Sequence, residues 1–384
     1  MRVLHVAPSI ARAYGGPTQS LAGYVRAAAL GGIETVVAAP TASAEEIEAL
    51  HSAGASEVRT FSSFGRRAMC MSPALVRWLR GASKEYDVTH VHGLFNPIST
   101  FGARAAIHEG SAVIIRPFGT LSRYTFTHRR GTLKRAWFSA LERRNIESAA
   151  GLHFTTAAER EGSEWHGLSG ATSYVVPPPW ISPNETPNHG GDDARPVVLF
   201  LSRINRVKNI AALIAAWPAV IRSVPSARLV IAGSGDAAYE AELHSQAAGL
   251  GVESSVSFPG FLSGREKSDA LAGASLFLLP SHHENFGMAV LEALAAGTPV
   301  VISPEVQLRD FVTTHQLGRV AEANPADIAS AIVDGLADRA LRDRVAAHGH
   351  RIVEETYGAA VVGEQLCSMY VGAMHQHRSR RKIS

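Results

Sequence analysis

The stretch SLFLLPSHHENFGMAVLEALAAGTPVVIS (275–303) contains one complete repeating unit of an α/β fold. An apolar strand pattern, SLFLLPS (275–281), leads through a loop into an apolar helix pattern, MAVLEALAA (288–296). A second apolar strand, PVVIS (299–303), follows at once. Near-continuous apolar strands joined by a helix predict a parallel sheet, because parallel neighbours require a crossover connection and are buried on both faces.

The same alternation of strand and helix patterns runs along the whole chain. The strands predicted in the first half are 2–9, 34–40, 57–63, 88–93, 112–119 and 151–156. Those predicted in the second half are 196–202, 227–233, 255–260, 275–281, 299–303 and 318–322. Helical patterns fill the intervals, so the sequence predicts two doubly wound α/β domains in tandem. In such domains ligands bind at the carboxyl ends of the strands, and the space between the domains is the expected pocket.

A segment without apolar periodicity separates the two series of strands. PNETPNHGGDDARP (183–196) is rich in Pro, Gly, Asn and Asp, which is typical of a linker. We therefore expect a first domain over 1–183, a linker over 184–196, a second domain over 197–356 and a basic tail over 375–384. A length of 384 residues suits two domains of ordinary size.

Composition excludes several classes of protein. A hydrophobic content of 46% with 18% charged residues is that of a globular protein. The net charge of +3 argues against a general nucleic-acid-binding protein, so no nucleic-acid partner is expected. Two cysteines, Cys70 and Cys367, are too few for a disulfide framework and suit a reducing compartment. Because neither a membrane-spanning run nor a signal peptide is evident, a cytoplasmic location is expected.

Positive charge is concentrated in two segments, 123–144 and 377–384. One interpretation is a solvated helix face and a frayed terminus. The other is attraction to an anionic membrane surface, with Trp137 and Phe138 as interfacial anchors. The second interpretation predicts a peripheral protein at the inner face of the cytoplasmic membrane.

Two cations follow the strand 196–202. Arg203 and Lys208 leave the same strand end just before a helix, where they would grip phosphate oxygens. Surface charge is the alternative interpretation. Arg206 lies between them and either points to the same place or is solvated.

Glycines follow two other strands. Gly233 and Gly235 form a turn that would let the backbone approach a ligand closely, although an ordinary strand–helix turn is also consistent. This turn lacks the third glycine of the dinucleotide fingerprint, so we do not predict an NAD-binding domain. Near the N-terminus, Gly15 and Gly16 precede a helix that opens at Pro17 and would present amides to an anion.

Two carboxylates flank a predicted helix N-terminus. Glu284 lies in the loop before this helix and Glu292 lies inside the helix. The amides at Gly287, Met288 and Ala289 form an anion site, while carboxylates accept hydrogen bonds from sugar hydroxyls. This combination suits a ligand that carries both phosphates and hydroxyls. For Glu292 the alternative is a buried acid paired with a nearby arginine or capping an amide.

Taken together, these segments resemble a known family. SHHENFGMAVLEALAAGTPVV is similar to the E-x7-E signature of retaining GT-B glycosyltransferases of family 4, the glycosyl transferases group 1. Arg203 and Lys208 fit that family's basic motif, with Ser202 where glycine is usual and Asn209 where glycine often follows. LVIAGSGD, the N-terminal GGP and the YVGAM helix also fit, so the resemblance covers nearly the whole chain and is strongest over 196–303.

The resemblance implies a fold and a donor site. The fold would be the GT-B architecture, with two Rossmann-like doubly wound parallel-sheet domains facing across a cleft and a C-terminal helix, 357–374, packed back on the first domain. Arg203 and Lys208 would neutralise the diphosphate of a nucleotide sugar, and Glu292 would hold its ribose. Glu284 and the amides of the helix start would bind the donor sugar and the diphosphate. The full donor set is Gly15, Gly16, Gly233, Gly235, Gly260, Phe261, Leu262, Asn285, Phe286, Gly287, Met288, Ala289 and Glu292.

The chain departs from the family pattern at one important position. Relatives carry a histidine before a glycine after a first-domain strand, whereas Phe118 precedes Gly119 here. His92, at another strand end, is the substitute we predict for the catalytic set, beside Glu284, Lys208 and Arg203. A structural histidine bonded to the backbone is the alternative.

The implied activity is retaining transfer of a sugar from a nucleotide-diphosphate sugar to a hydroxyl acceptor. No Asp-x-Asp pair is present to hold a divalent ion, so neither a metal nor another cofactor is expected. The acceptor would be a polyprenyl-linked or other lipid-linked glycan or a polysaccharide, in cell-envelope or exopolysaccharide biosynthesis, although a soluble acceptor is also consistent. The alternatives are a nucleotide-sugar 2-epimerase of the same architecture and a binding module that has lost its chemistry.

Overall fold

The chain folds as two compact units. The computed structural model describes residues 1–11, 16–65, 69–127, 131–164, 167–168, 171–182 and 194–383. Unit 1 comprises Met1–Ile181 together with Tyr357–Ser384, and unit 2 comprises Ser182–Thr356. Most of the predicted linker, and Gly15 of the predicted donor site, lie outside the described residues.

Unit 1 contains a seven-stranded parallel sheet in the order β3-β2-β1-β4-β5-β6-β7. Its strands are β1 (Arg2–Val6), β2 (Glu34–Pro40), β3 (Glu57–Phe61), β4 (Val88–His92), β5 (Ala112–Arg116), β6 (Gly151–Phe154) and β7 (Ser173–Val175). Its helices are α1 (Gly16–Leu30), α2 (Ala44–Ser52), α3 (Pro73–Ala82), η3 (Ser83–Glu85), α4 (Pro97–His108), α5 (Arg123–Thr127), α6 (Gly131–Trp137), η4 (Phe138–Glu142), α7 (Arg143–Ser148), α8 (Ala157–Glu161) and α16 (Ala359–Ile383).

Unit 2 contains a six-stranded parallel sheet in the order β10-β9-β8-β11-β12-β13. Its strands are β8 (Val197–Leu201), β9 (Arg228–Ala232), β10 (Val256–Gly260), β11 (Leu276–Leu279), β12 (Val300–Ile302) and β13 (Gly318–Val320). Its helices are η6 (Arg206–Lys208), α9 (Ile210–Ser223), α10 (Ala237–Gly249), η7 (Glu253–Ser255), α11 (Gly264–Ala272), α12 (Met288–Ala295), α13 (Arg309–Thr314) and α14 (Pro325–Ala337), and α15 (Arg339–Tyr357) follows.

Every strand predicted from the sequence is present, and the predicted fold class of two Rossmann-like parallel-sheet domains is confirmed. Most observed strands are shorter than predicted, because the predicted runs include the loop residues that follow the ladder. The sequence analysis missed β7, which has only three residues and no fully buried position. In both units the strand order reverses after the first strand, which places a topological switch point between β1 and β4 and another between β8 and β11.

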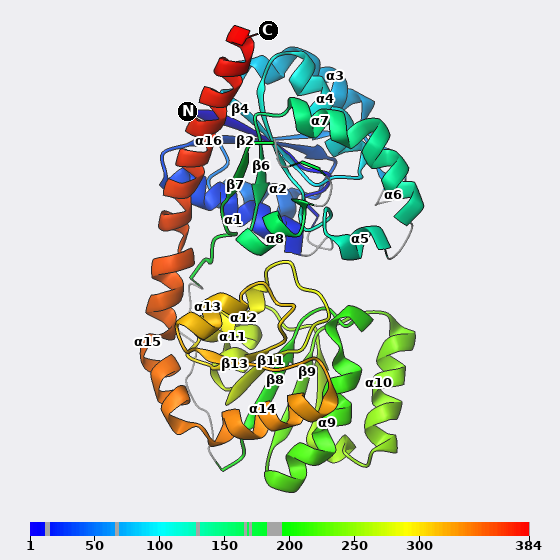
Figure 1. The fold of residues 1–384 in the computed structure, drawn as a ribbon, viewed down its shortest axis with the longest axis vertical. Helices are drawn as coiled ribbons and strands as arrows, with labels where there is room; N and C mark the ends of the chain where they lie inside the picture. Colours follow the sequence, from blue (N-terminus) through cyan, green and yellow to red (C-terminus); the bar gives the residue numbers. More distant parts are fainter. Residues whose placement is uncertain are drawn as a thin grey trace. The chain divides into compact units, whose positions relative to one another are not determined.

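Helices cover both faces of each sheet (Figure 1). On unit 1, α16 packs along α1, as the red and blue helices in Figure 1 show. Glycines permit this close approach: a Cβ on Gly363 would lie 2.4 Å from the carbonyl oxygen of Ala27. The α1–α16 layer covers a core that includes Val3, Ile114 and Leu366.

The C-terminal basic segment is not a frayed tail, as one interpretation of the sequence proposed. The last turns of α16 continue to Ile383 and bond to carbonyl groups of unit 1. The Arg380 guanidinium donates to the carbonyl oxygens of Glu147 and Ala149 at 2.9 and 2.8 Å. Arginine near a helix C-terminus is also favoured by the helix dipole, so this charge has a structural use.

The predicted aromatic anchors of segment 123–144 are wrong. Phe138 is buried, and the indole nitrogen of Trp137 donates to Thr100 Oγ1 and Glu142 Oε1 at 3.2 and 3.1 Å. Both rings therefore contact the interior of unit 1. Among the described residues of this segment, Leu133 is the exposed large apolar residue. Among the described helices, none is both long enough and apolar enough to span a bilayer. Attachment to an anionic membrane surface stays a prediction.

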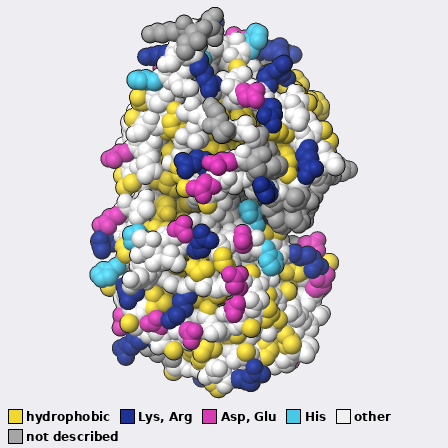
Figure 2. All heavy atoms as spheres, viewed as in Figure 1, with side chains coloured by type: hydrophobic (Ala, Val, Ile, Leu, Met, Phe, Trp, Pro, Cys, Tyr) yellow, Lys and Arg dark blue, Asp and Glu magenta, His cyan; other side chains and the backbone are white. Residues whose placement is uncertain are grey.

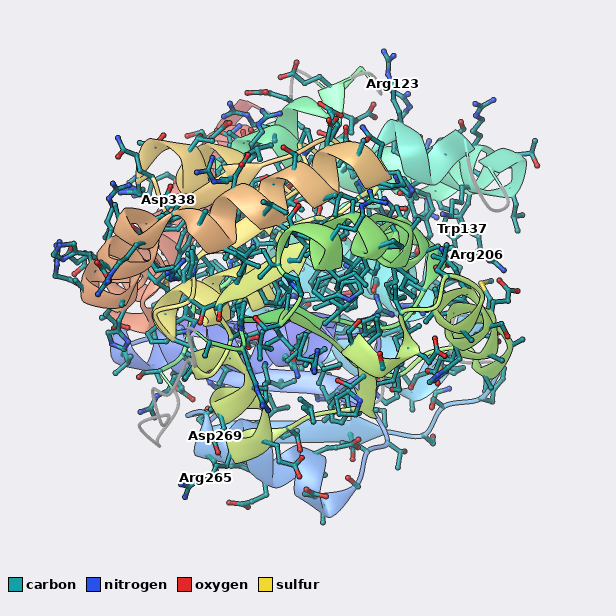
Figure 3. The ribbon with its side chains drawn as sticks, turned by 90° about the horizontal axis from the view of Figure 1, so that it is seen from below. Arg123, Trp137, Arg206, Arg265, Asp269 and Asp338 are labelled. Atoms are coloured by element: carbon teal, nitrogen blue, oxygen red, sulfur yellow. The ribbon has the colours of Figure 1, made fainter. Side chains whose placement is uncertain are left out.

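Charge is dispersed on the surface of unit 2. Figure 2 shows basic and acidic side chains interspersed on the face that it draws. Some charged residues of unit 2 form i,i+4 pairs along single helices, such as Arg265 with Asp269 on α11, labelled in Figure 3. Such exposed pairs contribute little to stability. Because both signs of charge are interspersed on the face in Figure 2, that face offers no large single-sign field.

Candidate functional site

Two predicted site residues meet at the switch point of unit 2. Lys208 ends η6 in the loop after β8, and Glu284 lies in the loop after β11. The Lys208 ammonium forms an ion pair with Glu284 Oε2, and their side chains are only 9% and 20% exposed. A partly buried ion pair of this kind is costly to break by removing one partner alone. The sequence predicted both residues at one site, and the structure brings them into direct contact.

The turn after Lys208 explains a residue that departs from the family pattern. Asn209 adopts a left-handed conformation with φ of 56° and begins α9. Glycine tolerates this conformation best and asparagine is the next most tolerant residue, which explains asparagine where glycine often occurs. The Asn209 amide also donates to the carbonyl oxygen of Ala323 at 2.8 Å.

The helix α12 begins beside this ion pair and carries no side-chain cap. Its N-cap residue, Gly287, has φ of 97°, and a Cβ there would lie 3.4 Å from Glu284 Cγ. The amides of Met288 and Ala289 start the helix, Phe286 is buried before it, and Asn285 lies in the preceding loop. An uncapped helix N-terminus stabilises an anion through its amides and its dipole.

The three arginine and lysine residues after β8 have different environments. Arg203 is exposed and forms no hydrogen bond or ion pair with any described residue. Arg206, labelled in Figure 3, instead pairs with Glu242 at 2.6 Å and lies over the Tyr239 ring. Arg206 is therefore held against α10, whereas Arg203 is available to a ligand.

Glu292 has a partner that the sequence analysis did not identify. Its carboxylate lies 2.6 Å from the ammonium of Lys267, on the neighbouring helix α11. The alternative interpretation, an acid paired with a nearby cation, therefore describes the ligand-free chain, with a lysine instead of an arginine. The spacing of Lys267 in the sequence gave no signal for this contact. Binding of ribose by Glu292 stays a prediction.

The glycines after β9 approach protein backbone. A Cβ on Gly233 or Gly235 would lie 1.9 Å from the carbonyl oxygen of Ser202 or Ile204, respectively. The glycines thus let the loops after β8 and β9 touch, with the Ile204 amide donating to Ser234 O at 2.9 Å. Packing of the two loops therefore accounts for both glycines, and approach of this turn to a ligand stays a prediction.

Substitution of Gly235 by alanine should destabilise unit 2. The new methyl group must move the Ile204 loop, which carries Lys208 at its far end, and overpacking of this kind costs about 1–3 kcal/mol. Urea unfolding measures the stability change, and the affinity for nucleoside diphosphates measures the displacement of the loop.

The matched control is Gly249→Ala at the end of α10, where a Cβ meets nothing within 4 Å. That change should leave affinity unaltered and raise stability by about 0.4–1 kcal/mol. Equal effects of the two substitutions would contradict the assigned role of Gly235.

Three further residues of the predicted donor set, Gly260, Phe261 and Leu262, lie at the end of β10 and directly after it. Gly260 has φ of 82° and an open Cβ direction, and its carbonyl accepts from the Gly233 amide at 2.7 Å. Phe261 is 70% exposed, and Leu262 is half-buried. An exposed aromatic ring at the carboxyl edge of a sheet is suited to stacking on a planar ligand.

Unit 1 has a small cavity at its own switch point. Its volume is about 230 Å³, and it is lined by Ala7, Pro8, Ser9, Leu21, His92, Gly93, Leu94, Asn96, Phe118 and Thr120. Both His92 and Phe118 therefore reach the same cavity, with ring centroids 6.0 Å apart. Gly16 begins α1. The His92 side chain bonds to another imidazole, that of His5, so the expected alternative of a histidine bonded to backbone is wrong.

Two buried carboxylates hold the loops around this cavity, and the sequence analysis missed both. Glu142 accepts from the Phe95 amide at 2.8 Å, and burial raises the pKa of its carboxyl. Glu159 accepts from the Gly119 amide at 2.5 Å. Phe95 and Phe118 both have positive φ, of 58° and 56°, a conformation that costs energy and needs such support.

The fold and the unit 2 site together define a class of protein. A Rossmann-like domain with a lysine, an uncapped helix N-terminus and acids at its switch point is built to bind a phosphorylated ligand that carries hydroxyls. Known families agree with this class. The family described as "Glycosyl transferases group 1" matches residues 182–351, and the "Glycosyl transferase 4-like domain" matches residues 15–180.

Curated relatives match part of the chain. An uncharacterized glycosyltransferase of Methanocaldococcus jannaschii is 34% identical over 48% of this chain and 47% of its own length. The phosphatidyl-myo-inositol mannosyltransferase of Mycobacterium tuberculosis is 33% identical over 45% and 46%. The alpha-monoglucosyldiacylglycerol synthase of Streptococcus pneumoniae is 33% identical over 38% and 33%. The chain thus spans about half or less of the length of these curated relatives.

Solved structures match the whole chain at low identity. Anabaena HepE in complex with UDP and glucose has a TM-score of 0.73 and 19% identity, covering 96% of this chain and 99% of that one. WaaG, a glycosyltransferase involved in lipopolysaccharide biosynthesis, has a TM-score of 0.66 and 15% identity, covering 97% and 100%. These likenesses support the fold, which is GT-B. The chain belongs to the group 1 glycosyltransferases of family 4.

Proposed function

We propose that the protein transfers a sugar from a nucleotide-diphosphate sugar to a hydroxyl group of a glycan or glycolipid acceptor, with retention of configuration and without a metal ion. The observation that carries this proposal is the Lys208–Glu284 ion pair beside the uncapped N-terminus of α12. A cation, the amides of a helix start and a carboxylate that would bind sugar hydroxyls lie together at this switch point.

The chemistry follows from where charge develops. As the glycosidic bond breaks, the leaving diphosphate gains negative charge, so a fixed ammonium and helix amides stabilise the transition state more than the ground state. Arg203, which is exposed and has no partner among the described residues, would add a second cation. These groups supply the charge stabilisation that a divalent ion gives in other phosphate-binding sites.

The ion pair also suggests how the site receives its ligand. Glu284 holds the largely buried Lys208 ammonium in a fixed orientation. A bound diphosphate would compete for that ammonium, and the released carboxylate would then accept hydrogen bonds from sugar hydroxyls. Lys267 would hold Glu292 in place for the ribose in the same way.

The acceptor class is inferred from the relatives. Two of the matched proteins are named for acting on phosphatidyl-myo-inositol and for making alpha-monoglucosyldiacylglycerol. The UDP and glucose bound to HepE support a nucleotide sugar as donor. We therefore propose a lipid-linked or polysaccharide acceptor of the cell envelope.

Incubation with UDP-, GDP-, ADP- and dTDP-sugars, alone and with lipid-linked acceptors, tests the proposal. We expect one donor to raise the thermal unfolding temperature and to release its nucleoside diphosphate, with the sugar attached to the acceptor as the same anomer. Conversion of the donor to a different nucleotide sugar would identify an epimerase instead. The proposal would be overturned if no donor either stabilised the protein or was turned over.

A further inference from the structure

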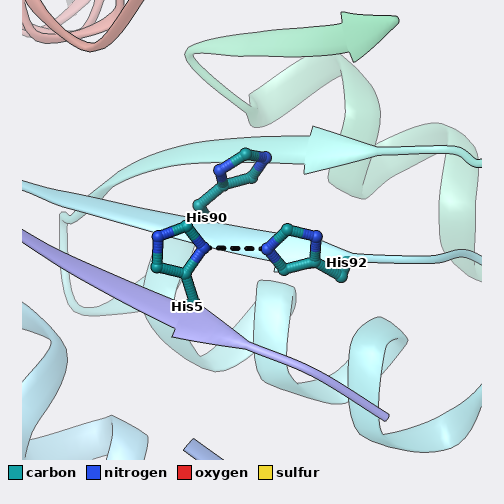
Figure 4. A group of neighbouring side chains, drawn as sticks. All are labelled: His5, His90 and His92. Atoms are coloured by element: carbon teal, nitrogen blue, oxygen red, sulfur yellow. Dashed lines mark hydrogen bonds between the residues drawn. The ribbon is translucent and has the colours of Figure 1, made fainter. Parts of the chain in front are cut away.

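A polar cluster lies inside unit 1, on the face of the sheet covered by α1 and α16. The sheet register pairs His5 with His90 and His92 with Arg116, so these four residues project from the same face. His5 Nδ1 and His92 Nε2 are 2.9 Å apart, as the dashed line in Figure 4 marks. His153 extends the cluster, with its Nδ1 3.1 Å from His90 Nε2.

The cluster contains a buried positive charge, on which the buried Glu159 carboxylate acts only from a distance. Arg116 is 2% exposed, and no described carboxylate forms an ion pair with it. Its one hydrogen bond is to Ser20 Oγ at 2.9 Å, and its guanidinium lies over the rings of Tyr24 and Phe118. Arginine cannot release its proton, so an unpaired buried guanidinium is energetically costly unless a ligand compensates it.

Four buried nitrogen atoms of this cluster have no hydrogen-bond partner among the residues that the structure describes. They are His5 Nε2, His92 Nδ1, Arg116 Nε and one terminal nitrogen of Arg116. Buried polar groups are normally satisfied, so a concentration of such atoms in one place indicates a ligand. His92 itself lines the 230 Å³ cavity, and Figure 4 shows its second ring nitrogen on the side away from His5.

The charge of the cluster decides which kind of ligand fits. Nitrogen atoms of His5, His90 and His92 lie within 4.8 Å of one another, close enough to hold a metal ion. A cation there would, however, be repelled by Arg116, which already lowers the pKa of His5 and His92 in addition to the larger effect of burial. An anion would be attracted by the same charge.

We propose that the unit 1 cavity binds a phosphoryl group, with His92 Nδ1–H as the direct donor and Arg116 as the charge that compensates it. Phe118 adjoins both, since it lines the cavity and its ring centroid lies 4.1 Å from the Arg116 guanidinium carbon. Binding selects the His92 tautomer with the proton on Nδ1, in which Nε2 accepts from His5. That this group belongs to a substrate, either the acceptor or the nucleotide donor, rests on the proposed function.

Inorganic phosphate is the first probe, in a chloride-free buffer and in a Lys208→Met background that removes the cation of the unit 2 site. We expect phosphate to raise the unfolding temperature of this protein, and Arg116→Met to weaken its affinity at least about tenfold. Without phosphate, Arg116→Met should unfold at no lower temperature, because it removes an uncompensated charge. The exposed Arg77→Gln on α3 is the control and should bind phosphate unchanged.

Two substitutions of His92 separate binding from structure. Asparagine places its amide where Nδ1 lies, whereas glutamine places its amide where Nε2 lies. His92→Asn should therefore keep most of the phosphate affinity, and His92→Gln should lose it while keeping the bond to His5. Equal losses for both variants would indicate a purely structural histidine and would contradict the proposal.

Further probes identify the source of the phosphoryl group. If the affinity for glycerol 3-phosphate depends on Arg116 and the affinity for a nucleoside diphosphate does not, the acceptor supplies the phosphoryl group. The opposite result assigns the phosphoryl group to the donor. Binding of zinc but not phosphate, or phosphate binding that ignores Arg116, overturns the inference. If the phosphate test fails but a nucleotide sugar is turned over, the inference is wrong and the proposed function stands. If phosphate binding depends on Arg116 but no nucleotide sugar is turned over, the inference stands and the proposed function is wrong.

Discussion

Replacing Lys208 by methionine should lower the rate of nucleoside diphosphate release by about 10²–10³-fold, the usual loss when one preorganised group that stabilises transition-state charge is removed. Lys208 is largely buried and its ammonium is held by Glu284, so it is the preorganised cation of the proposed site, whereas Arg203 is exposed. The rate constant under saturating donor is the quantity to measure, because the lost interaction is strongest as the diphosphate departs.

Stability must be separated from catalysis in this experiment. Lys208→Met leaves Glu284 partly buried without its partner, which is destabilising, and the double variant with Glu284→Gln should regain stability but not activity. Arg206→Gln is the matched control, because that cation is exposed and pairs with Glu242. A Lys208→Met protein that turns over at nearly the original rate would remove the central assumption of the proposed function.

Acidification should unfold unit 1 through its buried histidines. The pKa values of His5 and His153 are lowered from 6.5 to about 3, chiefly by burial and next by Arg116. Between pH 6.5 and about pH 3 the unfolded chain binds more protons than the folded one. The stability that these neutral histidines contribute is therefore fully present above pH 6.5 and is lost as the pH falls. At about 1.4 kcal/mol per pH unit for each group, these two histidines remove about 4 kcal/mol between pH 6.5 and about pH 5.

Other groups in the cluster act in the same direction. The pKa values of His90 and His92 are also lowered, and the surrounding Tyr24 and Tyr370 hydroxyls provide no negative charge to offset a protonated imidazole. Urea unfolding at several pH values, with hydrogen exchange of the β4 amides, would follow the loss. His153→Gln should flatten the pH dependence, whereas the exposed His108→Gln should not. Stability that is constant across this range would contradict the prediction.

The sequence predicted the element types because periodicity reports burial. Near-continuous apolar runs gave all but one of the strands, and the missing β7 has no fully buried residue to mark it. Capping was equally local: the Asn324 side chain accepts from the amides of Ala326 and Asp327 at the start of α14. Such features involve residues that are neighbours in the chain, so they can be predicted from the sequence.

The candidate site was predictable in position but not in its pairings. Lys208 and Glu284 follow strands whose carboxyl ends share one edge of the sheet, so their proximity follows from the fold class alone. The contact of Glu292 with Lys267, by contrast, depends on how two helices pack. The orientation of Trp137 toward Glu142 likewise could not be read from an amphipathic, basic segment.

By itself, the sequence determined two parallel α/β sheets and the loops that carry the charged groups. Only the tertiary structure decided that Gly233 and Gly235 meet backbone, that Phe118 and His92 share a cavity, and that Arg116 is buried without an ion-pair partner among the described residues. The physical reason is that a local pattern encodes whether each residue is buried. What it is buried against depends on strand order, register and helix packing, which join residues far apart in the chain.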